Sequence, residues 1–259
     1  MGRPVAFITG SSQGIGAGIA LEMAKAGYDI AINYNTSKEK ALEVKAKVEA
    51  EGAKTAVIGG NISKLDDIDR MFEEFFAVFS HVNVMVNNAG ITRFAPFLET
   101  TPDMFEILTN TDWRGSYFCA QKAARSMVEN GIKGTIINIT SNHQDGCWPQ
   151  ASVYGPTKAA LNKFTHNAAL ELAPYGIRMV SIAPGYTRNR DGSPGRPDWT
   201  GRIAHRLPLG RVCEPWEVGR ACVFLAGEGA GYITGTCIYM DGGALLPVVA
   251  ENTFFSWDK

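Results

Sequence analysis

Short apolar runs alternate with longer segments of helical periodicity along almost the whole chain. The apolar runs predict strands at residues 5–8, 29–34, 55–58, 82–86, 135–139, 179–183 and 237–240. Amphipathic patterns predict the helices between them, with long ones at about 103–130, 154–173 and 214–226. Parallel strands need crossover connections of this kind, and strands that are apolar on both sides suit a covered sheet. The alternation therefore predicts an α/β fold, a parallel sheet with helices on both faces.

The chain is expected to form one domain over residues 1–259, because no linker or shift in composition divides it. With 45% hydrophobic and 20% charged residues, it has the composition of a globular protein with a buried core. Residues 188–206 break the alternation, and we expect them to form a structureless substrate loop. Residues 245–259 form a C-terminal extension, which we expect to pack against a neighbouring subunit through Phe254, Phe255 and Trp257.

Charge and cysteine content exclude several classes of partner. The formal net charge is -1, from 25 basic and 26 acidic residues, which argues against nucleic-acid and anionic-membrane partners. No apolar run has the length of a transmembrane helix. The five cysteines lack paired spacing, which favours reduced thiols in a cytoplasmic protein, and the four histidines are too scattered to indicate a metal site. A small-molecule substrate is therefore the expected partner.

A glycine-rich turn, TGSSQGIG, directly follows the first expected strand and precedes a helix. In a dinucleotide-binding turn, glycines allow a tight bend and a close approach of the backbone to pyrophosphate, and the helix N-terminus offers free N–H groups. The spacing G-x-x-x-G-x-G differs from the common G-x-G-x-x-G. The cofactor-binding residues expected here are Gly10, Ser12, Gln13, Gly14, Ile15 and Gly16.

The run NYNTSK at residues 33–38 ends the second expected strand, where a carboxylate would bind the ribose 2′-hydroxyl of NAD. The run has no carboxylate, and it also lacks the arginine expected beside a 2′-phosphate. Its polar, mildly basic character tolerates a phosphate better than a carboxylate would. We therefore favour NADP(H) over NAD(H), with Tyr34, Asn35 and Thr36 near the cofactor. Alternatively, these residues only cap the helix that starts at Lys38.

Tyr154 and Lys158 lie four residues apart on one expected helix, so their side chains share a face. Ser141 lies just past the fifth expected strand, at the carboxyl end where parallel sheets bind ligands. Tyrosine, with an ordinary pKa of about 10, is a poor base at neutral pH. A nearby lysine cation favours the phenolate, and a serine hydroxyl can hold a substrate oxygen. This trio predicts hydride transfer at a carbonyl or alcohol carbon.

These motifs together resemble the short-chain dehydrogenase/reductase family: TGSSQGIG at 9–16, NNAG at 87–90, Ser141, YGPTK at 154–158, PG at 184–185 and DGG at 241–243. The resemblance implies a Rossmann-like, doubly wound, seven-stranded parallel sheet, usually in a homotetramer. It implies Tyr154 as the general acid/base, Ser141 as a ligand of the substrate oxygen and Lys158 as a ligand of the nicotinamide ribose. It also implies cofactor contacts at Asn61, Ile62, Asn87, Asn88, Ala89, Gly90, Pro184, Gly185, Thr187 and Asn189.

Asp112 departs from the family pattern N-x-x-G, whose asparagine completes a proton relay. A role made through the backbone carbonyl would survive this change. A side-chain role would differ, because an ionised carboxylate cannot donate a hydrogen bond. Asp112 is kept among the expected catalytic residues, and the sequence leaves open which of these two roles it has.

Residues 142–149 and the C-terminal extension resemble the sugar 1-dehydrogenases of the family. His143, Gln144 and Trp148 would suit a polyhydroxylated ligand, although His143 could equally face water. We expect an NAD(P)-dependent oxidoreductase acting on a secondary alcohol, hemiacetal or ketone, with a sugar or polyol as substrate. One alternative is a 3-oxoacyl reductase, for which a basic patch beside the cleft would bind the acidic acyl carrier protein. The other is a non-catalytic nucleotide-binding regulator.

Overall fold

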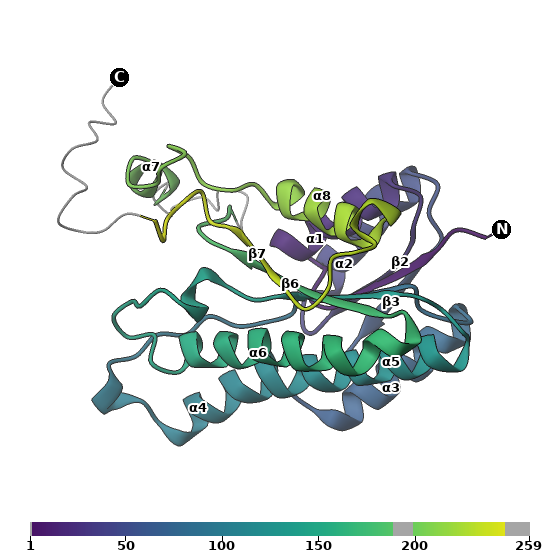
Figure 1. Ribbon diagram of the computed structural model, residues 1–259, viewed down its shortest axis with the longest axis horizontal. Helices are drawn as coiled ribbons and strands as arrows, with labels where there is room; N and C mark the ends of the chain where they lie inside the picture. Colours follow the sequence, from purple (N-terminus) through teal and green to yellow (C-terminus); the bar gives the residue numbers. More distant parts are fainter. Residues whose placement is uncertain (1, 189–198, 247–259) are drawn as a thin grey trace.

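A computed structural model describes residues 2–188 and 199–246 of the chain. In this part, seven parallel strands form one sheet in the order β3-β2-β1-β4-β5-β6-β7 (Figure 1). The strands are β1 (Val5–Ile8), β2 (Asp29–Tyr34), β3 (Thr55–Gly59), β4 (Val84–Asn87), β5 (Thr135–Ile139), β6 (Arg178–Pro184) and β7 (Cys237–Met240). The expected doubly wound parallel sheet is confirmed.

Helices cover both faces of the sheet, and each face has its own hydrophobic core (Figure 1). One face carries α1 (Gly14–Lys25), α2 (Lys38–Ala50) and α8 (Pro215–Ala226). The other carries α3 (Leu65–Val78), α5 (Ser116–Glu129) and α6 (Tyr154–Leu172). Because both faces are covered, the central strands are apolar throughout rather than alternating.

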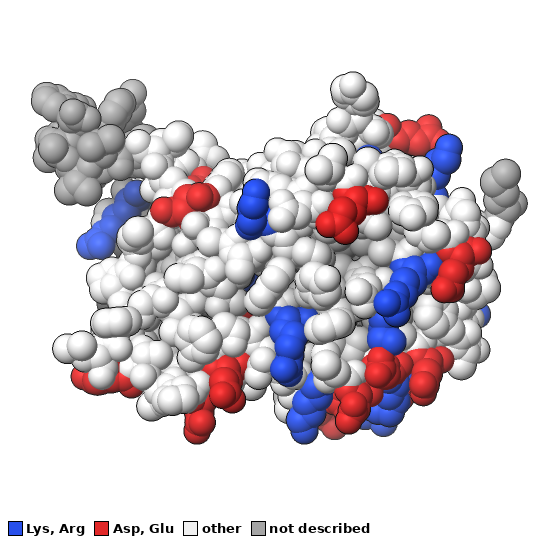
Figure 2. Space-filling model, turned by 60° about the horizontal axis from the view of Figure 1, so that its bottom comes forward, with Lys and Arg blue, Asp and Glu red and all other residues white. Residues whose placement is uncertain are grey.

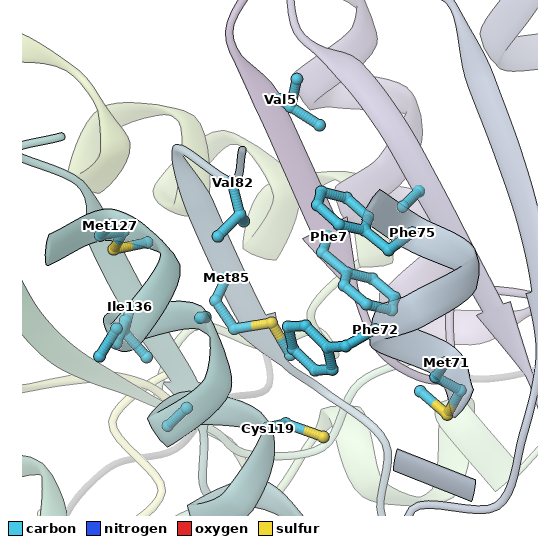
Figure 3. Close-up of a cluster of buried hydrophobic side chains, with 14 of the residues drawn as sticks. Val5, Phe7, Met71, Phe72, Phe75, Val82, Met85, Cys119, Met127 and Ile136 are labelled. Atoms are coloured by element: carbon cyan, nitrogen blue, oxygen red, sulfur yellow. The ribbon is translucent and has the colours of Figure 1, made fainter. Parts of the chain in front are cut away.

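Strand β1 shows how the two cores fix the position of the chain. Val5 and Phe7 point into the core beneath α3, and Ala6 and Ile8 point into the opposite core. The Phe7 ring stacks on Phe75 with ring centroids 5.0 Å apart, and Figure 3 shows them beside Phe72 and Met85. Since β1 is buried on both faces, its carboxyl end is held in place, and the glycine-rich turn begins there.

The sheet reverses its winding direction at β1. The chain moves outward from β1 to β2 and β3, and then returns to place β4 on the other side of β1. Loops that follow β1 and β4 therefore diverge above the carboxyl ends of the two strands. In open parallel sheets, a ligand-binding crevice forms at such a reversal.

Two expected elements differ from the structure. The single helix expected at 103–130 is three segments: α4 (Pro102–Leu108), a π-helical segment η2 (Thr109–Gly115), and α5. A π segment hardly changes the helical periodicity of a sequence. The expected structureless loop contains the helix α7 (Trp199–Ala204), where burial of Thr200 orders a segment without clear periodicity. Residues 189–198 and 247–259 lie outside the described residues, and so do Asn189 and the aromatic residues of the extension.

Three general features limit the kinds of site in this chain. Within residues 2–188 and 199–246, no helix is long and apolar enough to span a bilayer. In the same residues, no group of three His, Cys, Asp or Glu side chains could hold a metal ion. All five cysteines are free thiols, and burial raises the pKa of Cys119 to about 12. The cavities at the carboxyl ends of the strands are therefore the places to look for chemistry.

Candidate active site

A cleft of about 510 Å³ opens where β1, β2 and β4 end. Its walls are the glycine-rich turn, the ends of β2 and β3, the loop after β4, and residues from η2 and α6. Most of the expected cofactor-binding residues line it: Gly10, Ser12, Gln13, Gly14, Ile15, Gly16, Asn35, Thr36, Asn61, Ile62, Asn88, Ala89, Gly90, Tyr154 and Lys158. The topology therefore brings together residues from five separate stretches of sequence.

The glycine-rich turn and the loop after β4 are held together by close packing and by hydrogen bonds. Gly10 has a φ of +61°, and a Cβ there would lie 2.8 Å from the Cα of Ala89, so only glycine fits. Thr9 Oγ1 accepts hydrogen bonds from the backbone N–H groups of Asn88 and Ala89, each at 3.0 Å. The Asn88 side chain donates back to the Thr9 carbonyl at 2.9 Å. The wall is therefore rigid before any ligand arrives.

The N-terminus of α1 offers its backbone donors to this cleft. The helix begins at Gly14, and the side chain of the N-cap residue Gln13 makes no capping hydrogen bond. The first N–H groups of a helix have no partner within it and carry partial positive charge. Together with the close glycine turn, this end of the cleft fits a pyrophosphate group.

Two residues expected at the adenosine end do not line this cleft, and one residue that was not expected there does. Tyr34 packs against β3, with its ring at Gly59, and does not line the cleft. Asn87 is buried, and its side chain donates to Asn138 Oδ1 at 2.8 Å. Asn33 lines the cleft instead, and its Oδ1 accepts from the Gly10 N–H at 2.9 Å. A strand buried on both faces gives no alternation from which to choose among neighbouring residues.

Tyr154 and Lys158 stand on the first turns of α6, and both are nearly buried. Lys158 Nζ lies 5.8 Å from the centre of the Tyr154 ring and donates to the Ile139 carbonyl at 3.3 Å. Burial alone would lower the pKa of Lys158, but the Asp112 carboxylate and the Tyr154 oxygen outweigh burial and raise it. Lys158 is therefore a buried cation beside the tyrosine.

Asp112 lies on η2 and is fully buried. Its Oδ1 accepts a hydrogen bond from the Ile91 N–H at 2.8 Å, and its Oδ2 lies 3.3 Å from Lys158 Nζ. Burial raises the pKa of Asp112 against the opposing pull of Lys158 and the Ile91 N–H. The side chain of Asp112 is thus part of the site, whereas the sequence alone leaves a side-chain role and a backbone-carbonyl role both open.

A second cavity, of about 190 Å³, adjoins the first at Tyr154 and Ile15. The expected residues Pro184, Gly185 and Thr187 line this cavity rather than the larger cleft. His143 and Trp148 line it too, together with Tyr186, which sequence reasoning missed. Tyr154 therefore stands where a nucleotide cleft meets a small second pocket.

Aromatic rings form the wall of the second cavity. The His143 ring stacks on Trp148 with centroids 3.9 Å apart, and it meets the Tyr154 ring edge-on at 5.2 Å. Phe94, a residue that sequence reasoning missed, lies 5.8 Å from His143 on a loop far away in sequence. Burial lowers the pKa of His143, so the imidazole is neutral at neutral pH. This side of the second cavity therefore consists of aromatic rings and carries few charged groups.

Ser141 and Gln144, which were also expected on the substrate side, form hydrogen bonds within the protein. Ser141 lines neither cavity, and its Oγ accepts from the His143 N–H at 3.2 Å, capping the short helix η3 (Asn142–Gln144). The Gln144 amide donates to the Tyr239 hydroxyl at 2.7 Å, and that hydroxyl donates in turn to Asp145 Oδ2. These contacts tie the loop after β5 to strand β7.

Comparison with known proteins places the chain in a family. Residues 10–244 match the family model described as enoyl-(acyl carrier protein) reductase. The 3-oxoacyl-[acyl-carrier-protein] reductase FabG of Staphylococcus epidermidis is 35% identical over 238 residues, which cover 92% of this chain and 97% of that protein. The family-model match spans the glycine-rich turn from Gly10 onward, strands β2 to β7 and the Tyr154 segment.

Solved structures agree with the sequence matches. The acetoin dehydrogenase YohF of Salmonella typhimurium superposes with a TM-score of 0.89 at 32% identity, covering 95% of this chain and 98% of that one. The angucycline C-6 ketoreductase LanV, solved with bound NADP, gives a TM-score of 0.87 at 29% identity over 94% and 96% of the two chains. The relatives are named as reductases and dehydrogenases, which excludes the alternative of a non-catalytic regulator. The chain belongs to the short-chain dehydrogenase/reductase family and is an NAD(P)-dependent oxidoreductase.

Proposed function

We propose that this enzyme interconverts a secondary alcohol and a ketone, with Tyr154 as the general acid and base. The observation that carries this proposal is the position of Tyr154, which lines both the nucleotide cleft and the second cavity. A proton donor at that junction reaches a substrate oxygen in one cavity and stays beside a cofactor in the other. The nicotinamide, when bound, supplies or accepts the hydride.

The proton travels through the Tyr154 hydroxyl in both directions. In reduction the hydroxyl gives its proton to the substrate oxygen, and in oxidation the phenolate takes it back. The Lys158 cation, 5.8 Å from the ring centre, favours the phenolate that forms on the way. Ser141 keeps its proposed role as a ligand of the substrate oxygen: its Oγ accepts from the His143 N–H, and its hydroxyl proton could serve the substrate once the side chain turns toward the second cavity, which it does not line in this structure.

The residues that would hold the cofactor come from each wall of the cleft. The glycine-rich turn and the start of α1 would bind the pyrophosphate, and Asn61 and Ile62 would lie by the adenine. Lys158 would hold the nicotinamide ribose. Pro184, Gly185 and Thr187, which line the second cavity beside Tyr154, would contact the carboxamide.

NADP(H) is the preferred cofactor in this proposal. The wall at Asn35–Ser37 offers amide and hydroxyl groups and no carboxylate that would repel a 2′-phosphate. Lys40, on the first turn of α2, extends its Nζ to Gln13 Oε1 at 3.0 Å, so a cation stands at the rim of this wall. The related ketoreductase LanV was solved with NADP bound.

A sugar or polyol remains our favoured substrate, because His143 and Trp148 line a small cavity as a stacked aromatic pair, against which the apolar side of a sugar can pack. The alternative is a 3-oxoacyl group on acyl carrier protein, favoured by 35% identity to FabG. A carrier protein needs a basic docking patch. On the face drawn in Figure 2, lysines and arginines are interspersed with acidic residues, so that face offers no such patch.

We also propose a single domain over residues 1–259 that assembles as a homotetramer in the cytoplasm. Large apolar side chains are exposed on the outer helices and the edge strand, which supports assembly: Leu170 on α6, Trp216 and Phe224 on α8, and Tyr239 on β7. The five free thiols support a reducing compartment.

A turnover assay tests this function directly. Sugars, polyols, small hydroxyketones, steroids and 3-oxoacyl thioesters would each be offered with NADP(H) and with NAD(H). We expect turnover of at least one secondary alcohol or ketone. The kcat/KM with NADP(H) should exceed that with NAD(H) by about tenfold, the value of one charge-assisted contact to the 2′-phosphate. A protein that binds neither cofactor, or that prefers NAD(H), would contradict the respective part of the proposal.

A further inference from the structure

We propose that Asp112 is a positioning residue that sets the pH at which Tyr154 loses its proton, through its ion pair with Lys158. The proposal rests on the proposed role of Tyr154 and deepens it. Asp112 lines the nucleotide cleft but not the second cavity, where the substrate would bind. It acts on Tyr154 only through the charge and the position of the lysine between them.

The geometry holds the pair in one arrangement. The Ile91 N–H fixes Asp112 Oδ1 at 2.8 Å, which leaves Oδ2 directed at Lys158 Nζ, 3.3 Å away. The carboxylate side chain is 0% exposed and the lysine side chain 5% exposed. In an interior of low dielectric, two charges at this distance act on each other, and on a neighbouring ionisable group, far more strongly than at a surface, although burying them costs solvation.

The loop after β4 closes over this pair. A Cβ at Gly90 would lie 3.1 Å from Asp112 Oδ2 and 3.2 Å from Lys158 Nζ. The glycine thus lets the backbone of a cofactor-binding loop pass directly above both charges. Among the described residues, Tyr154 from α6 is the titratable group beside the pair, and His143 from η3 contacts the Tyr154 ring rather than the pair. Burial lowers the pKa of His143. Arg93 on the loop after β4 is exposed.

The carboxylate compensates the charge that would otherwise act on Tyr154. A lone buried ammonium 5.8 Å from the ring would strongly favour the phenolate. Paired with Asp112, the same ammonium belongs to a neutral pair, and its pull on the phenolate is weaker. An asparagine could still accept from the Ile91 N–H, but its amide would carry no charge. The pair therefore holds ionisation of Tyr154 at higher pH than an amide at position 112 would.

The variant Asp112→Asn tests this with two readouts. In the pH profile of alcohol oxidation, the acid limb of kcat/KM should move down by about one pH unit, because the uncompensated lysine stabilises the phenolate. The near-ultraviolet phenolate absorbance of the cofactor-free protein should move by the same amount. The Tyr154 signal is isolated by subtracting the titration of a Tyr154→Phe protein, made with and without the Asp112→Asn change.

A matched control is Asp69→Asn, which removes the carboxylate of a surface ion pair with Lys122. It should leave both titrations unchanged, since exposed charges are screened by water and salt. An Asp112→Asn protein whose phenolate titration coincides with that of the wild type overturns the proposal. If the wild type turns over no substrate, the proposed function fails, and the absorbance titration still decides the effect of Asp112. If Asp112→Asn does not fold, Asp112→Glu, which retains the charge on a longer arm, should keep the wild-type midpoint, and a downward shift there overturns the proposal.

Discussion

The two sides of the active-site cleft are held by different kinds of interaction. On the cofactor side, buried polar side chains at strand ends lock the backbone of neighbouring loops. On the substrate side, aromatic rings from loops far apart in sequence stack on one another. The first kind of wall follows from strand topology and local spacing, and the second depends on packing that forms only in the folded protein.

Asn33 illustrates the cofactor side. It is 1% exposed, and its amide group donates to the carbonyls of Ile58 and Gly60 while accepting from the Gly10 N–H. Three strand ends are thereby tied together through one side chain. Buried polar side chains whose donors and acceptors are hydrogen-bonded in this way specify one backbone arrangement.

His143 illustrates the substrate side. Its imidazole is half-buried between Trp148 and Phe94, and its Nδ1 has no hydrogen-bond partner among the described residues. Ring contacts are less directional than hydrogen bonds, so this wall can adjust to a ligand. The cofactor side should therefore respond sharply to small backbone changes, and the substrate side should respond gradually to loss of a ring.

Among the changes that test this contrast between the two walls, Gly10→Ala has the largest expected effect. Alanine would carry a left-handed φ and press its Cβ to 2.8 Å from the Ala89 Cα, straining the turn and the loop after β4 together. Strain of roughly 1–3 kcal/mol corresponds to an increase of about fivefold to a hundredfold in the Kd for NADPH. Fluorescence titration with NADPH measures this Kd.

Gly27→Ala is the matched control for this change. Gly27 also has a positive φ, of +92°, but a Cβ there meets no atom within 4 Å. It should lower thermal stability and leave the Kd for NADPH unchanged. Equal cofactor affinities for the two alanine variants would show that the lock between the turn and the loop after β4 does not matter for binding.

A smaller effect is expected from Trp148→Ala. Losing the ring that stacks on His143 removes roughly 0.5–1.5 kcal/mol, which should raise the KM for substrate by about two- to tenfold. The Kd for NADPH should stay constant, because Trp148 lines the second cavity and not the nucleotide cleft. Steady-state kinetics give the KM for substrate, and fluorescence titration gives the Kd for NADPH. Measuring both on one protein preparation separates the effect on substrate from the effect on cofactor.

Tyr232→Ala, at a fully exposed residue of the loop before β7 and outside both cavities, controls for the general loss of an aromatic ring. It should leave the KM for substrate as it is in the wild type. If Trp148→Ala weakens the cofactor as much as the substrate, the two walls are not independent, and the contrast between them fails.

The same contrast explains how much the sequence could predict. Strand positions and the glycine-rich turn follow from local patterns, because apolar runs and glycine spacing do not depend on the rest of the chain. The choice between Asn33 and Tyr34 could not be made, since β2 is buried on both faces and shows no alternation. The π segment that directs Asp112 toward Lys158 was missed, because a local widening leaves the helical pattern nearly intact.

The substrate side was the least predictable. Stacking of His143 against Phe94 joins residues 49 positions apart in numbering, and no local pattern indicates such a contact. The capping of η3 by Ser141 also escaped prediction, because a residue expected to bind substrate can serve the backbone as well. Sequence reasoning therefore placed His143 and Trp148 at the second cavity, but it could not predict the tertiary contacts that hold them there.

Tyr154 lies where the two walls meet, and the proposed reaction depends most on the proton of its hydroxyl group. In Tyr154→Phe the ring keeps its edge-on contact with His143, so the site should keep its shape while losing the hydroxyl. Turnover should fall by about a thousandfold or more, as expected for loss of a general acid and base, while the Kd for NADPH stays near the wild-type value. Turnover within a few-fold of the wild type, with cofactor bound normally, would contradict the account.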